Sequence, residues 1–402
     1  METTEFLIVG CGPAGATAAR EAARAGIDTV VLERDAIIGA KRVCAAGLRP
    51  GFCETFDLPR RIVHCDTPRL ALFAADGGEH EVLFGPGHTT TREELDGTMA
   101  SLAAAEGAQL RTQALFRGLQ RDGRRARIEY ADVQTGERRC MTARHVFFAN
   151  GATARLDGRD FGALAMAHWG VGLMATLQYR IYLGTPANPI AYRTLELHYY
   201  RGLCGRQVIG WMFPKRDHLA IGLGVMGKIG GAALREELEA LERRIRSRLY
   251  PRVRVTEVRQ EGSLLYGGLP RPRLADGAAL VGGTAAGLVD ATNGEGIYEA
   301  AMSGRYAAEA IDGARRHGDD AGARYAAAVR GRFARRLTHR VRLMHYLEAR
   351  PRRFGLLFAQ LARTPRLAAV LHQEDRERRL SDRLYLYQQT LYFGIRTLAC
   401  RE

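Results

Sequence analysis

The sequence predicts an α/β protein in which a Rossmann-like domain is joined to an antiparallel-sheet domain and to a helical C-terminal region. A glycine-rich turn between a short apolar strand and an alanine-rich helix opens the chain. Residues 173–225 have mostly strand-like patterns, and nearly everything after Gly296 has helical ones. A chain of 402 residues that is 46% hydrophobic can bury the cores of two or three such domains.

The N-terminal segment has the order of a βαβ unit. Residues 6–9 predict a short buried strand, residues 15–25 an alanine-rich helix, and residues 29–32 a second buried strand. Gly26 stands where a C-cap glycine is expected, so the helix is predicted to end there.

One further helix and several strands complete the two predicted domains. Thr91 and Glu94 have the spacing of a capping box and predict a helix over residues 91–105. Residues 47–59 look irregular. Strands are predicted at 69–73, 81–84, 126–130, 142–148, 173–183, 194–200, 207–213 and 218–225, and an amphipathic helix at 234–249. The last four strands suit an antiparallel sheet that forms one wall of a pocket.

Positive charge is concentrated towards the C-terminus. The net charge is +15, and residues 324–366 contain twelve arginines and one acid, Glu348. Apolar residues recur through this segment at helical spacing. The segment is therefore a solvated helical face, a contact with an anionic membrane, or a nucleic-acid contact. Because no nucleic-acid-binding fold accompanies it, we expect no nucleic-acid partner.

A glycine motif follows the first strand. Gly10, Gly12 and Gly15 form G-x-G-x-x-G, and Glu33 ends the next strand. The glycines permit a tight turn beside a pyrophosphate at the helix N-terminus, and the acid accepts hydrogen bonds from a ribose. This context predicts dinucleotide binding. A second G-x-G-x-x-G, at residues 222–227, is interpreted as a sheet edge turning into a helix, so no separate NADPH domain is expected.

A second glycine-dense run lies far along the chain. Residues 282–298 read GGTAAGLVDATNGEGIY. A nicotinamide dinucleotide needs only the first run, whereas a buried FAD would place its pyrophosphate at one helix N-terminus and its ribityl-flavin at another. The two runs together indicate one elongated FAD.

Four stretches give the chain a resemblance to a known family. They are GCGPAG at 10–15 with Glu33, KRVCAAGL at 41–48, GWMFPK at 210–215, and the run at 283–298. The chain resembles the geranylgeranyl reductase family, FAD-dependent enzymes of the p-hydroxybenzoate hydroxylase structural class. The matching family patterns are K-x-C-G-G-G-L, G-W-x-F-P-K and G-D-A-A-G-x-x-x-P-x-x-G-E-G-I-Y. The C-terminal third matches only loosely.

The resemblance implies a division into domains. Residues 1–50, 90–155 and 270–312 would form a discontinuous FAD-binding domain. Residues 51–89 and 156–269 would form a β-rich substrate domain, and residues 313–402 a helical, arginine-rich region.

The resemblance, together with the glycine motifs, also implies a set of FAD-binding residues. They are Gly10, Gly12, Ala14, Gly15, Glu33, Arg34, Arg42, Cys44, Ala45, Gly47, Arg92, Phe116, Thr284, Gly294, Gly296 and Ile297. Arg92, at the start of a helix, can pair with the pyrophosphate. Gly294 and Gly296 let the backbone lie against the isoalloxazine ring, and the helix that follows would stabilise negative charge on it.

Two positions depart from the family pattern. Thr284 stands where the family has an acid, and Asn150 stands where related flavoproteins have one. Both side chains can still hydrogen-bond a ribityl hydroxyl. FAD binding is therefore still expected, but the loss of two acids beside the cofactor would weaken its retention. We predict a yellow protein that releases FAD more readily than its relatives do.

The reaction that the resemblance implies is the reduction of isoprenoid double bonds. Reduced FAD would pass hydride from N5 to an alkene carbon, and a proton would add to the other carbon. Trp211, Phe213 and Pro214 would contact the apolar substrate tail. The further candidates for this wall are Met212, Tyr179, Tyr182, His198 and Tyr200, but ordinary core packing is the favoured role for each aromatic taken singly, except Trp211 and Phe213, whose motif matches the family. Cys44 would be either the catalytic proton donor or a small packing residue.

Substrate, reductant and location follow from the same resemblance. The isoprenoid tail would be carried by a lipid, tetrapyrrole, quinone or terpenoid, and the external reductant would be NADPH or reduced ferredoxin. The alternatives are a flavin-dependent monooxygenase or halogenase on the same scaffold, and a flavoprotein that only carries electrons. The seven cysteines have no metal-like spacing, so reduced thiols and no metal are expected. Without a signal peptide or a spanning stretch, the chain is expected to be cytoplasmic, with peripheral membrane contact as a further alternative.

Overall fold

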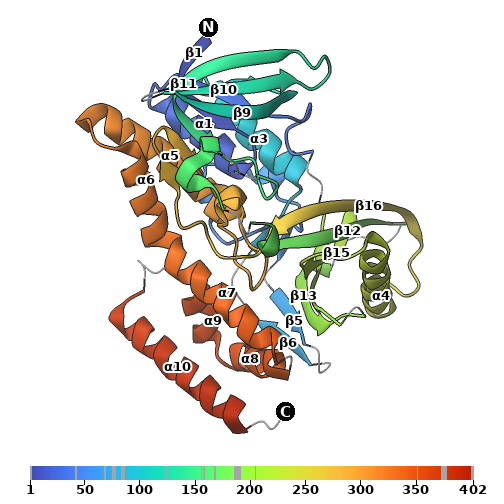
Figure 1. Ribbon diagram of the computed structural model, residues 1–402. Coiled ribbons are helices and arrows are strands. Elements are labelled where there is room, and N and C mark those ends of the chain that lie inside the picture. Colours follow the sequence, from blue (N-terminus) through green and yellow to red (C-terminus); the bar gives the residue numbers. More distant parts are fainter. Residues whose placement is uncertain are drawn as a thin grey trace.

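Two large sheets and a group of C-terminal helices make up the molecule (Figure 1). The computed structural model describes residues 2–40, 43–67, 69–74, 78–82, 87–122, 125–154, 156, 159–166, 169–184, 192–203, 205–350, 352–372 and 378–399. The predicted fold class is confirmed. The exact division into three domains stays a prediction.

The first sheet has eight strands in the order β17-β18-β11-β1-β2-β8, with β10 and β9 added beside β11. Its strands are β1 (Glu2–Val9), β2 (Thr29–Leu32), β8 (Gln109–Arg111), β9 (Ala114–Asp122), β10 (Arg125–Asp132), β11 (Arg138–Phe148), β17 (Ala275–Asp276) and β18 (Ala279–Val281). Strand β1 pairs in parallel with both β2 and β11. This is the sheet that the βαβ order predicts.

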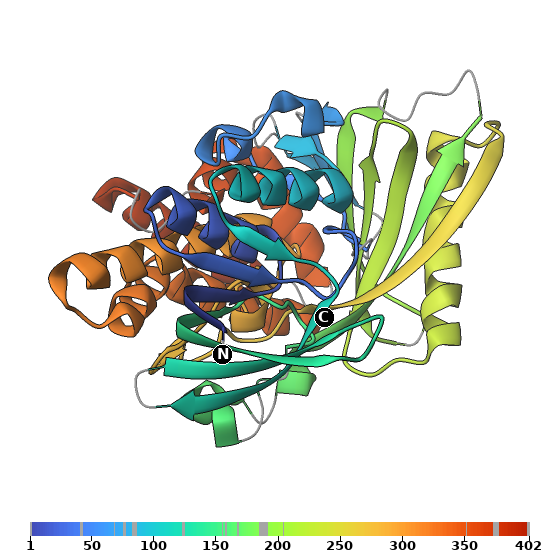
Figure 2. The ribbon, with the colours of Figure 1, turned by 90° about the horizontal axis from the view of Figure 1, so that it is seen from above.

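Helices α1 (Pro13–Arg24), α3 (Arg92–Ala105) and α5 (Ile297–His317) gather beside this sheet (Figures 1 and 2). Thr91 caps α3 as predicted, because its hydroxyl accepts from the Glu94 N–H at 3.3 Å. Helices α1 and α5 approach most closely at Gly304. A Cβ on Gly304 would overlap Ala14 O and lie 2.9 Å from Ala18 N, so only glycine fits there without displacing α1.

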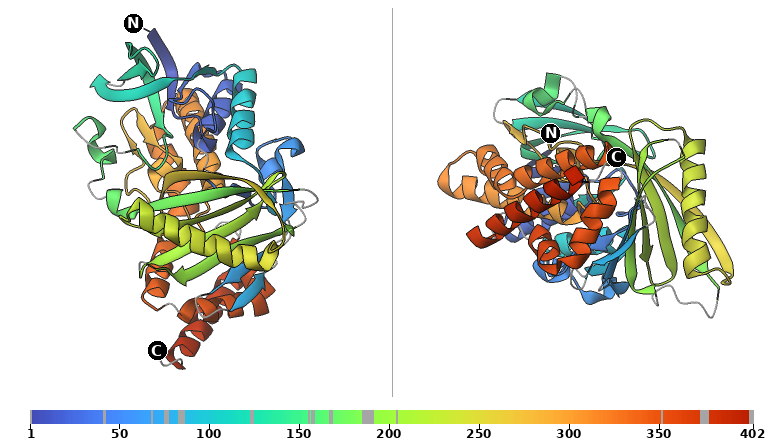
Figure 3. Two further views of the ribbon diagram at one scale, coloured as in Figure 1. Left: turned by 90° about the vertical axis from the view of Figure 1, so that its right-hand side faces the viewer. Right: turned by 90° about the horizontal axis from the view of Figure 1, so that it is seen from below.

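The second sheet has seven strands in the order β16-β12-β15-β14-β13-β5-β6. They are β5 (Arg69–Phe73), β6 (Glu79–Val82), β12 (Leu173–Leu183), β13 (Thr194–Arg201), β14 (Gln207–Pro214), β15 (His218–Met226) and β16 (Val255–Tyr266). Helix α4 (Gly231–Leu249) lies across the outer face of this sheet (Figure 3). Its Leu238, Leu241 and Ile245 are buried in one cluster with Met212 of the sheet.

Smaller elements connect the two sheets. A three-stranded sheet contains β3 (Gly47–Leu48), β4 (Cys65–Thr67) and β7 (Gly87–Thr89), and a one-turn helix, α2, spans Phe52–Thr55. The C-terminal helices are α6 (Ala321–Val329), α7 (Arg335–Glu348), α8 (Arg352–Arg363), α9 (Pro365–His372) and α10 (Leu380–Ala399). A short π-helical segment, Arg330–Ala334, joins α6 to α7.

Several predicted element boundaries were wrong. Helix α1 begins at Pro13, two residues earlier than predicted, because proline is well suited to the first helical position. Strand β16 was missed because it is long and mostly exposed and carries charged side chains without a clear apolar alternation. Strands β7 and β9 were also missed, and part of the strand predicted at 81–84 lies outside the described residues.

The second glycine motif has the role that the sequence predicts. Gly222 and Gly224 lie inside β15, and Gly227, at φ +79°, follows its last residue before α4 begins. The sequence therefore turns from sheet to helix here. The glycine at 222 also makes room for the Trp211 indole, which a Cβ would overlap.

Candidate functional site

A cavity of about 600 Å³ takes its lining residues from both large sheets. Val9, Gly10 and Leu32 line it from the first sheet, and Trp211 and Phe213 line it from the second. The segments that the sequence links to a cofactor therefore share one cavity with the segment that it links to an apolar substrate.

The part of the cavity beside β1 and β2 has the structure of a dinucleotide site. Gly10 has φ +96°, and a Cβ on Gly15 would overlap Gly10 O, so the turn needs both glycines. Helix α1 begins at this turn with glycine at its N-cap and proline at its first position, so its first N–H groups lack side-chain caps. Such an N-terminus favours a bound anion.

Glu33 is fixed beside the glycine turn. Its Oε2 accepts from the Cys11 N–H at 2.8 Å, and its Oε1 accepts from the Asp35 N–H at 3.0 Å. Two backbone donors thus orient the carboxylate. This is the position where the glycine motif predicts a ribose contact.

Arg92 lies against the same turn from α3. A Cβ on Gly12 would lie 3.5 Å from its Nη2, and its Nε donates to Asp96 Oδ1 at 2.9 Å. Burial by itself would lower the pKa of the Arg92 guanidinium, but Asp96 and the Cys44 thiol raise it above the usual value. A permanently charged guanidinium is therefore held beside the helix N-terminus.

The Cys44–Gly47 loop lines the cavity in a strained conformation. Ala46 has φ +44°, a left-handed geometry that favours glycine, and the family pattern has glycine at this position. The loop is held by the Thr90 N–H, which donates to Ala46 O at 3.0 Å, and by Lys215, whose Nζ donates to Ala45 O at 2.5 Å. Cross-strand contacts on both sides thus keep Cys44 in the cavity wall.

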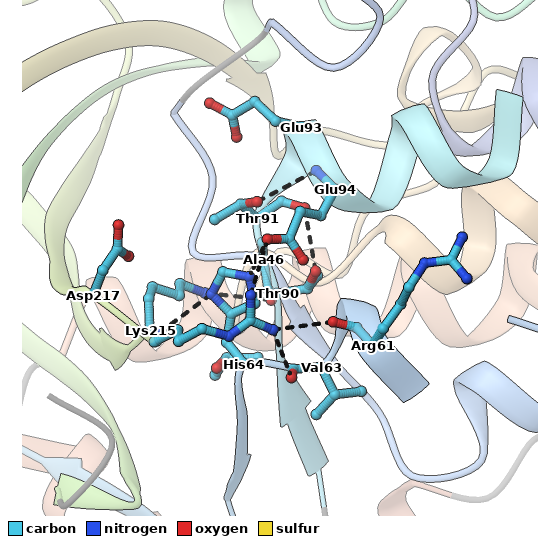
Figure 4. A network of polar contacts seen from close by, with 12 residues as sticks. Ala46, Arg61, Val63, His64, Thr90, Thr91, Glu93, Glu94, Lys215 and Asp217 are labelled. Carbon is cyan, nitrogen blue, oxygen red and sulfur yellow. Dashed lines mark hydrogen bonds and ion pairs between the residues drawn. The ribbon is translucent and has the colours of Figure 1, made fainter. Parts of the chain in front are cut away.

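Lys215 is the least expected charged residue of the site. Lys215 directly follows β14 and is 1% exposed. Its ammonium donates to the Ala45 and Ala46 carbonyls, and Figure 4 shows it beside Ala46. Burial is the main cause that lowers the pKa of this ammonium to about 7, with a smaller contribution from Arg180 and with Cys44 opposing the shift. A proton on Lys215 is therefore exchanged near neutral pH, directly behind the Cys44–Gly47 loop.

A polar network continues from Lys215 to the start of α3. His64 Nε2 lies 3.0 Å from Glu94 Oε1, and the Arg216 N–H donates to His64 Nδ1 at 3.3 Å (Figure 4). Arg216 also donates to the backbone carbonyls of Arg61 and Val63. Burial lowers the pKa of His64, so at neutral pH this imidazole is neutral.

The 283–297 segment forms another part of the cavity wall. Gly283 has φ +56° and Gly294 has φ +74°, so both need glycine. Helix α5 begins directly after Gly296, which offers no side-chain cap. The uncapped N-termini of α1 and α5 therefore both face one cavity, as a flavin dinucleotide requires.

Buried ion pairs join this segment to the C-terminal helices. Arg49 Nε lies 2.7 Å from Glu295 Oε1, and Arg49 Nη2 lies 3.1 Å from Glu299 Oε1. Arg336 of α7 also pairs with Glu299, which is fully buried. Burial and the neighbouring Glu295 raise the pKa of Glu299 above its ordinary value, although the guanidiniums of Arg49 and Arg336 oppose the shift.

Several arginines of the basic segment are thus used inside the molecule. Arg340 Nε lies 3.3 Å from Asp290 Oδ2, Arg332 donates to the Tyr298 hydroxyl at 2.9 Å, and Arg330 donates to Pro272 O at 3.0 Å. The arginine cluster therefore stabilises the wall of the cavity as well as contributing surface charge.

The apolar wall follows the alternation of the second sheet. Trp211 and Phe213 face the cavity, and Met212 between them faces α4. The Trp211 Nε1–H donates to Gln178 Oε1 at 3.0 Å, which fixes the indole. The remaining apolar lining from this sheet is Leu70, Leu195, Leu197, Leu264 and Leu265.

The other aromatic residues predicted for this wall lie elsewhere. Tyr179 and Tyr200 pack in the cluster under α4, because alternate residues of a strand face opposite sides. His198 is hydrogen-bonded to Glu196 and stacks on Phe73, and Tyr182 packs against His218. None of these four side chains lines the cavity, so they have the ordinary packing role that the sequence favours for each of them singly.

The predicted cofactor and substrate residues are mostly brought together. Those that line the cavity are Gly10, Gly12, Ala14, Glu33, Arg34, Cys44, Ala45, Gly47, Arg92, Phe116, Trp211, Phe213, Thr284, Gly294, Gly296 and Ile297. Gly15 packs behind the wall against Gly10, and Pro214 is outside the lining, with its carbonyl accepting from Thr89 Oγ1 at 2.7 Å. Arg42 lies outside the described residues.

Sequence reasoning missed several residues of the site. Lys215 stands in the G-W-x-F-P-K match but was not assigned a role, and Leu264 and Leu265 belong to the unpredicted β16. Arg49 and Glu295 pair across 246 positions, for which the sequence carries no local signal.

The residues present fit FAD. Asn150 lines the cavity, and its buried Oδ1 has no hydrogen-bond partner among the described residues, as expected of an acceptor that waits for a ligand hydroxyl. Two uncapped helix N-termini and the fixed Glu33 carboxylate supply the complementary anion and ribose contacts. Over the described part of the chain, no cluster of His, Cys, Asp or Glu could hold a metal ion.

Comparison with known proteins agrees with this geometry. A family model described as "FAD binding domain" matches residues 3–157. The fold, the cavity and this match define the chain as an FAD-dependent oxidoreductase. Among curated proteins it is 29% identical, over 320 residues, to geranylgeranyl diphosphate reductase of Synechocystis sp., covering 76% of this chain and 74% of that one.

A second curated relative and a solved structure complete the comparison. The chain is 30% identical to digeranylgeranylglycerophospholipid reductase 2 of Methanopyrus kandleri, over 76% of each chain. A geranylgeranyl bacteriochlorophyll reductase-like protein from Thermoplasma acidophilum has the same fold, with a TM-score of 0.67, 22% identity and 96% coverage of both chains. The chain belongs to the geranylgeranyl reductase family.

Proposed function

We propose that the protein reduces carbon–carbon double bonds of an isoprenoid chain. The observation that carries this proposal is that one cavity combines a dinucleotide site with an apolar wall. Glu33 and Arg92 line its polar part, and Trp211 and Phe213 line its apolar part. Reduced FAD, when bound, supplies the hydride that adds to one carbon of the double bond.

The lining residues divide into contacts for each part of FAD. Glu33 would accept from the adenosine ribose, and the start of α1 with Arg92 would hold the pyrophosphate. Thr284 and Asn150 would hydrogen-bond the ribityl chain. Gly294, Gly296 and Ile297 would lie against the isoalloxazine ring, with the dipole of α5 directed at it. These assignments rest on position in the cavity.

The apolar wall would hold the substrate tail and exclude water. Trp211 is fixed through Gln178, and Phe213 fills the space that Gly47 leaves open, since a Cβ on Gly47 would lie 2.6 Å from the Phe213 ring. A rigid wall of this kind orients an alkene and keeps water and oxygen from the reacting atoms.

Cys44 is the candidate proton donor. It lines the cavity, is partly buried, and interacts with Arg92 and Lys215. A packing role predicts that Cys44→Ala keeps nearly full activity, whereas a donor role predicts that Cys44→Ala loses activity and that Cys44→Ser retains part of it.

The external reductant is proposed to be NADPH or reduced ferredoxin. The positive net charge of +15 favours encounter with an acidic protein donor electrostatically. Anaerobic bleaching of the bound flavin by one donor and not by the other identifies it.

Product analysis under anaerobic conditions tests the proposal. The holoprotein is reduced with dithionite and mixed with geranylgeranyl chains carried on a diphosphate, a glycerophospholipid, a tetrapyrrole or a quinone. The expected product gains two hydrogen atoms per reduced double bond by mass spectrometry. A product that forms only with oxygen would favour a monooxygenase or halogenase, and flavin reoxidation without product an electron carrier.

A further inference from the structure

We infer that the outer face of α10 is a docking surface for an anionic lipid membrane. Six large apolar side chains of this helix are more than half exposed: Leu380, Leu384, Tyr387, Leu391, Tyr392 and Ile395. They make up six of the fourteen exposed large apolar residues found over the described chain. No other described element carries so many.

The exposed residues form a stripe. At about 100° per residue, Leu380, Leu384, Tyr387, Leu391 and Ile395 fall within an arc of about 80°. The opposite side of α10 packs inwards through Tyr385, Leu386 and Phe393. The helix is therefore apolar both towards the protein and towards solvent. Helix α10 lies on the underside of the molecule (Figure 3), and the residues of its outer stripe are exposed.

The charge around the stripe selects the occupant. Residues 352–399 contain nine arginines and four acids, three of which lie in the 373–377 link outside the described residues. Four arginines on or next to helices α8, α9 and α10 are exposed: Arg363, Arg366, Arg379 and Arg383. The fourth acid, Asp382, already pairs with Arg366. A second copy would bring the same positive charge against this face, whereas an anionic bilayer accepts both the arginines and the apolar stripe.

The stripe fits a helix that lies in the membrane surface. No described helix is long and apolar enough to cross a membrane. Leucines with tyrosines on one face and arginines beside them are the composition of an interfacial helix. The inner side chains of α10 pack against the same apolar cluster as Phe213 and Trp211 of the cavity wall. Docking through α10 would therefore place the apolar wall of the cavity near the lipid phase.

This inference goes beyond the proposed reaction and is tested without it. The full-length holoprotein is sedimented with phosphatidylglycerol vesicles and with phosphatidylcholine vesicles, at low and at high salt. We expect binding to phosphatidylglycerol that weakens at high salt and much weaker binding to phosphatidylcholine. The double variant Leu384→Glu/Leu391→Glu is expected to bind at least about tenfold more weakly.

A matched control is available on other surfaces of the molecule. Val171 and Leu203 are at least as exposed as the two leucines, so Val171→Glu/Leu203→Glu adds the same charge elsewhere and should leave binding within about twofold of the wild type. Unchanged flavin content of all variants shows that they are folded.

Three results would overturn the inference. The first is that the wild type binds neither phosphatidylglycerol nor phosphatidylcholine vesicles. The second is that the α10 variant and the control variant bind phosphatidylglycerol vesicles equally well. The third is a wild-type dimer in sedimentation velocity that the α10 variant dissociates, which would assign the stripe to a second copy. Loss of reductase activity with intact vesicle binding would refute the proposed function alone.

Discussion

The substitution Gly304→Ala tests whether the close contact of α1 and α5 sets the geometry of the cofactor site. A Cβ at position 304 would overlap Ala14 O and lie 2.9 Å from Ala18 N. Both are backbone atoms and cannot rotate away, so α5 must shift. Overpacking of this kind costs about 3 kcal/mol, and the better helix propensity of alanine returns about 1 kcal/mol. The expected net loss is therefore about 2 kcal/mol.

The matched control is Gly313→Ala on the same helix. The nearest atoms to a Cβ there belong to the flexible Arg324 side chain, at 3.2 Å and beyond, so the helix gains about 1 kcal/mol. The two variants should differ by about 3 kcal/mol, which corresponds to about 3–4 °C in melting temperature for a chain of this length. Differential scanning fluorimetry of both holoproteins measures this difference. Because α1 and α5 both begin at the cavity, Gly304→Ala should also release FAD faster. Equal melting temperatures and equal flavin retention of the two variants would show that the α1–α5 contact does not set the geometry of the cofactor site.

The remaining predictions concern the cavity wall. Lys215 has a pKa of about 7 in the folded protein against an ordinary value of 10.5. Between these two pH values the unfolded chain binds one proton more than the folded chain, so the free energy of unfolding rises with pH across that window, by up to about 5 kcal/mol. Lys215→Met should lack this rise, and parallel curves of melting temperature against pH for the two proteins would contradict the prediction. Thr284→Asp should lower the dissociation constant of FAD by about tenfold through a charge-assisted hydrogen bond, measured by flavin fluorescence, and unchanged retention would count against a ribityl contact. Trp211→Ala should raise the KM for a substrate with an isoprenoid tail by at least about tenfold while the flavin content stays constant. Trp211→Phe is the milder control. An unchanged KM would show that Trp211 does not contact the substrate.

Most elements of the FAD-binding region could be predicted because they depend on local sequence patterns. The strand at 29–32, the α3 N-cap at Thr91 and the glycine turn at 10–15 each depend on residues within a few positions of one another. Their physical causes, buried strands, side-chain capping and positive φ, act locally. These elements were therefore predicted to within a few residues.

The opposite orientations of Trp211 and Met212 could also have been predicted. Adjacent residues of a strand face opposite sides, so an inward Trp211 and Phe213 require Met212 to face α4. The same rule separates Leu197 from Tyr200 on β13. Naming Met212 and Tyr200 as candidates for the same wall as Trp211 did not take this alternation into account.

Contacts between residues far apart in the chain could not be predicted from the sequence. Lys215 meets Ala45 across 170 positions, and Arg49 meets Glu299 across 250. Their roles emerge only when β14 and α5 have packed beside the Cys44–Gly47 loop. Strand β16 was missed for a related reason, because pairing with β12 and not its own apolar pattern holds it in the sheet.

An anaerobic titration tests whether one cavity holds FAD beside an isoprenoid double bond. The reduced holoprotein is titrated with a geranylgeranyl-bearing substrate while the absorbance of oxidised flavin is followed. We expect the flavin to reoxidise without oxygen, with one flavin oxidised for each double bond reduced, and Trp211→Ala to need more substrate to reach the same extent. A flavin that stays reduced with every such substrate until oxygen is admitted would show that the cavity does not bring the flavin and the double bond together.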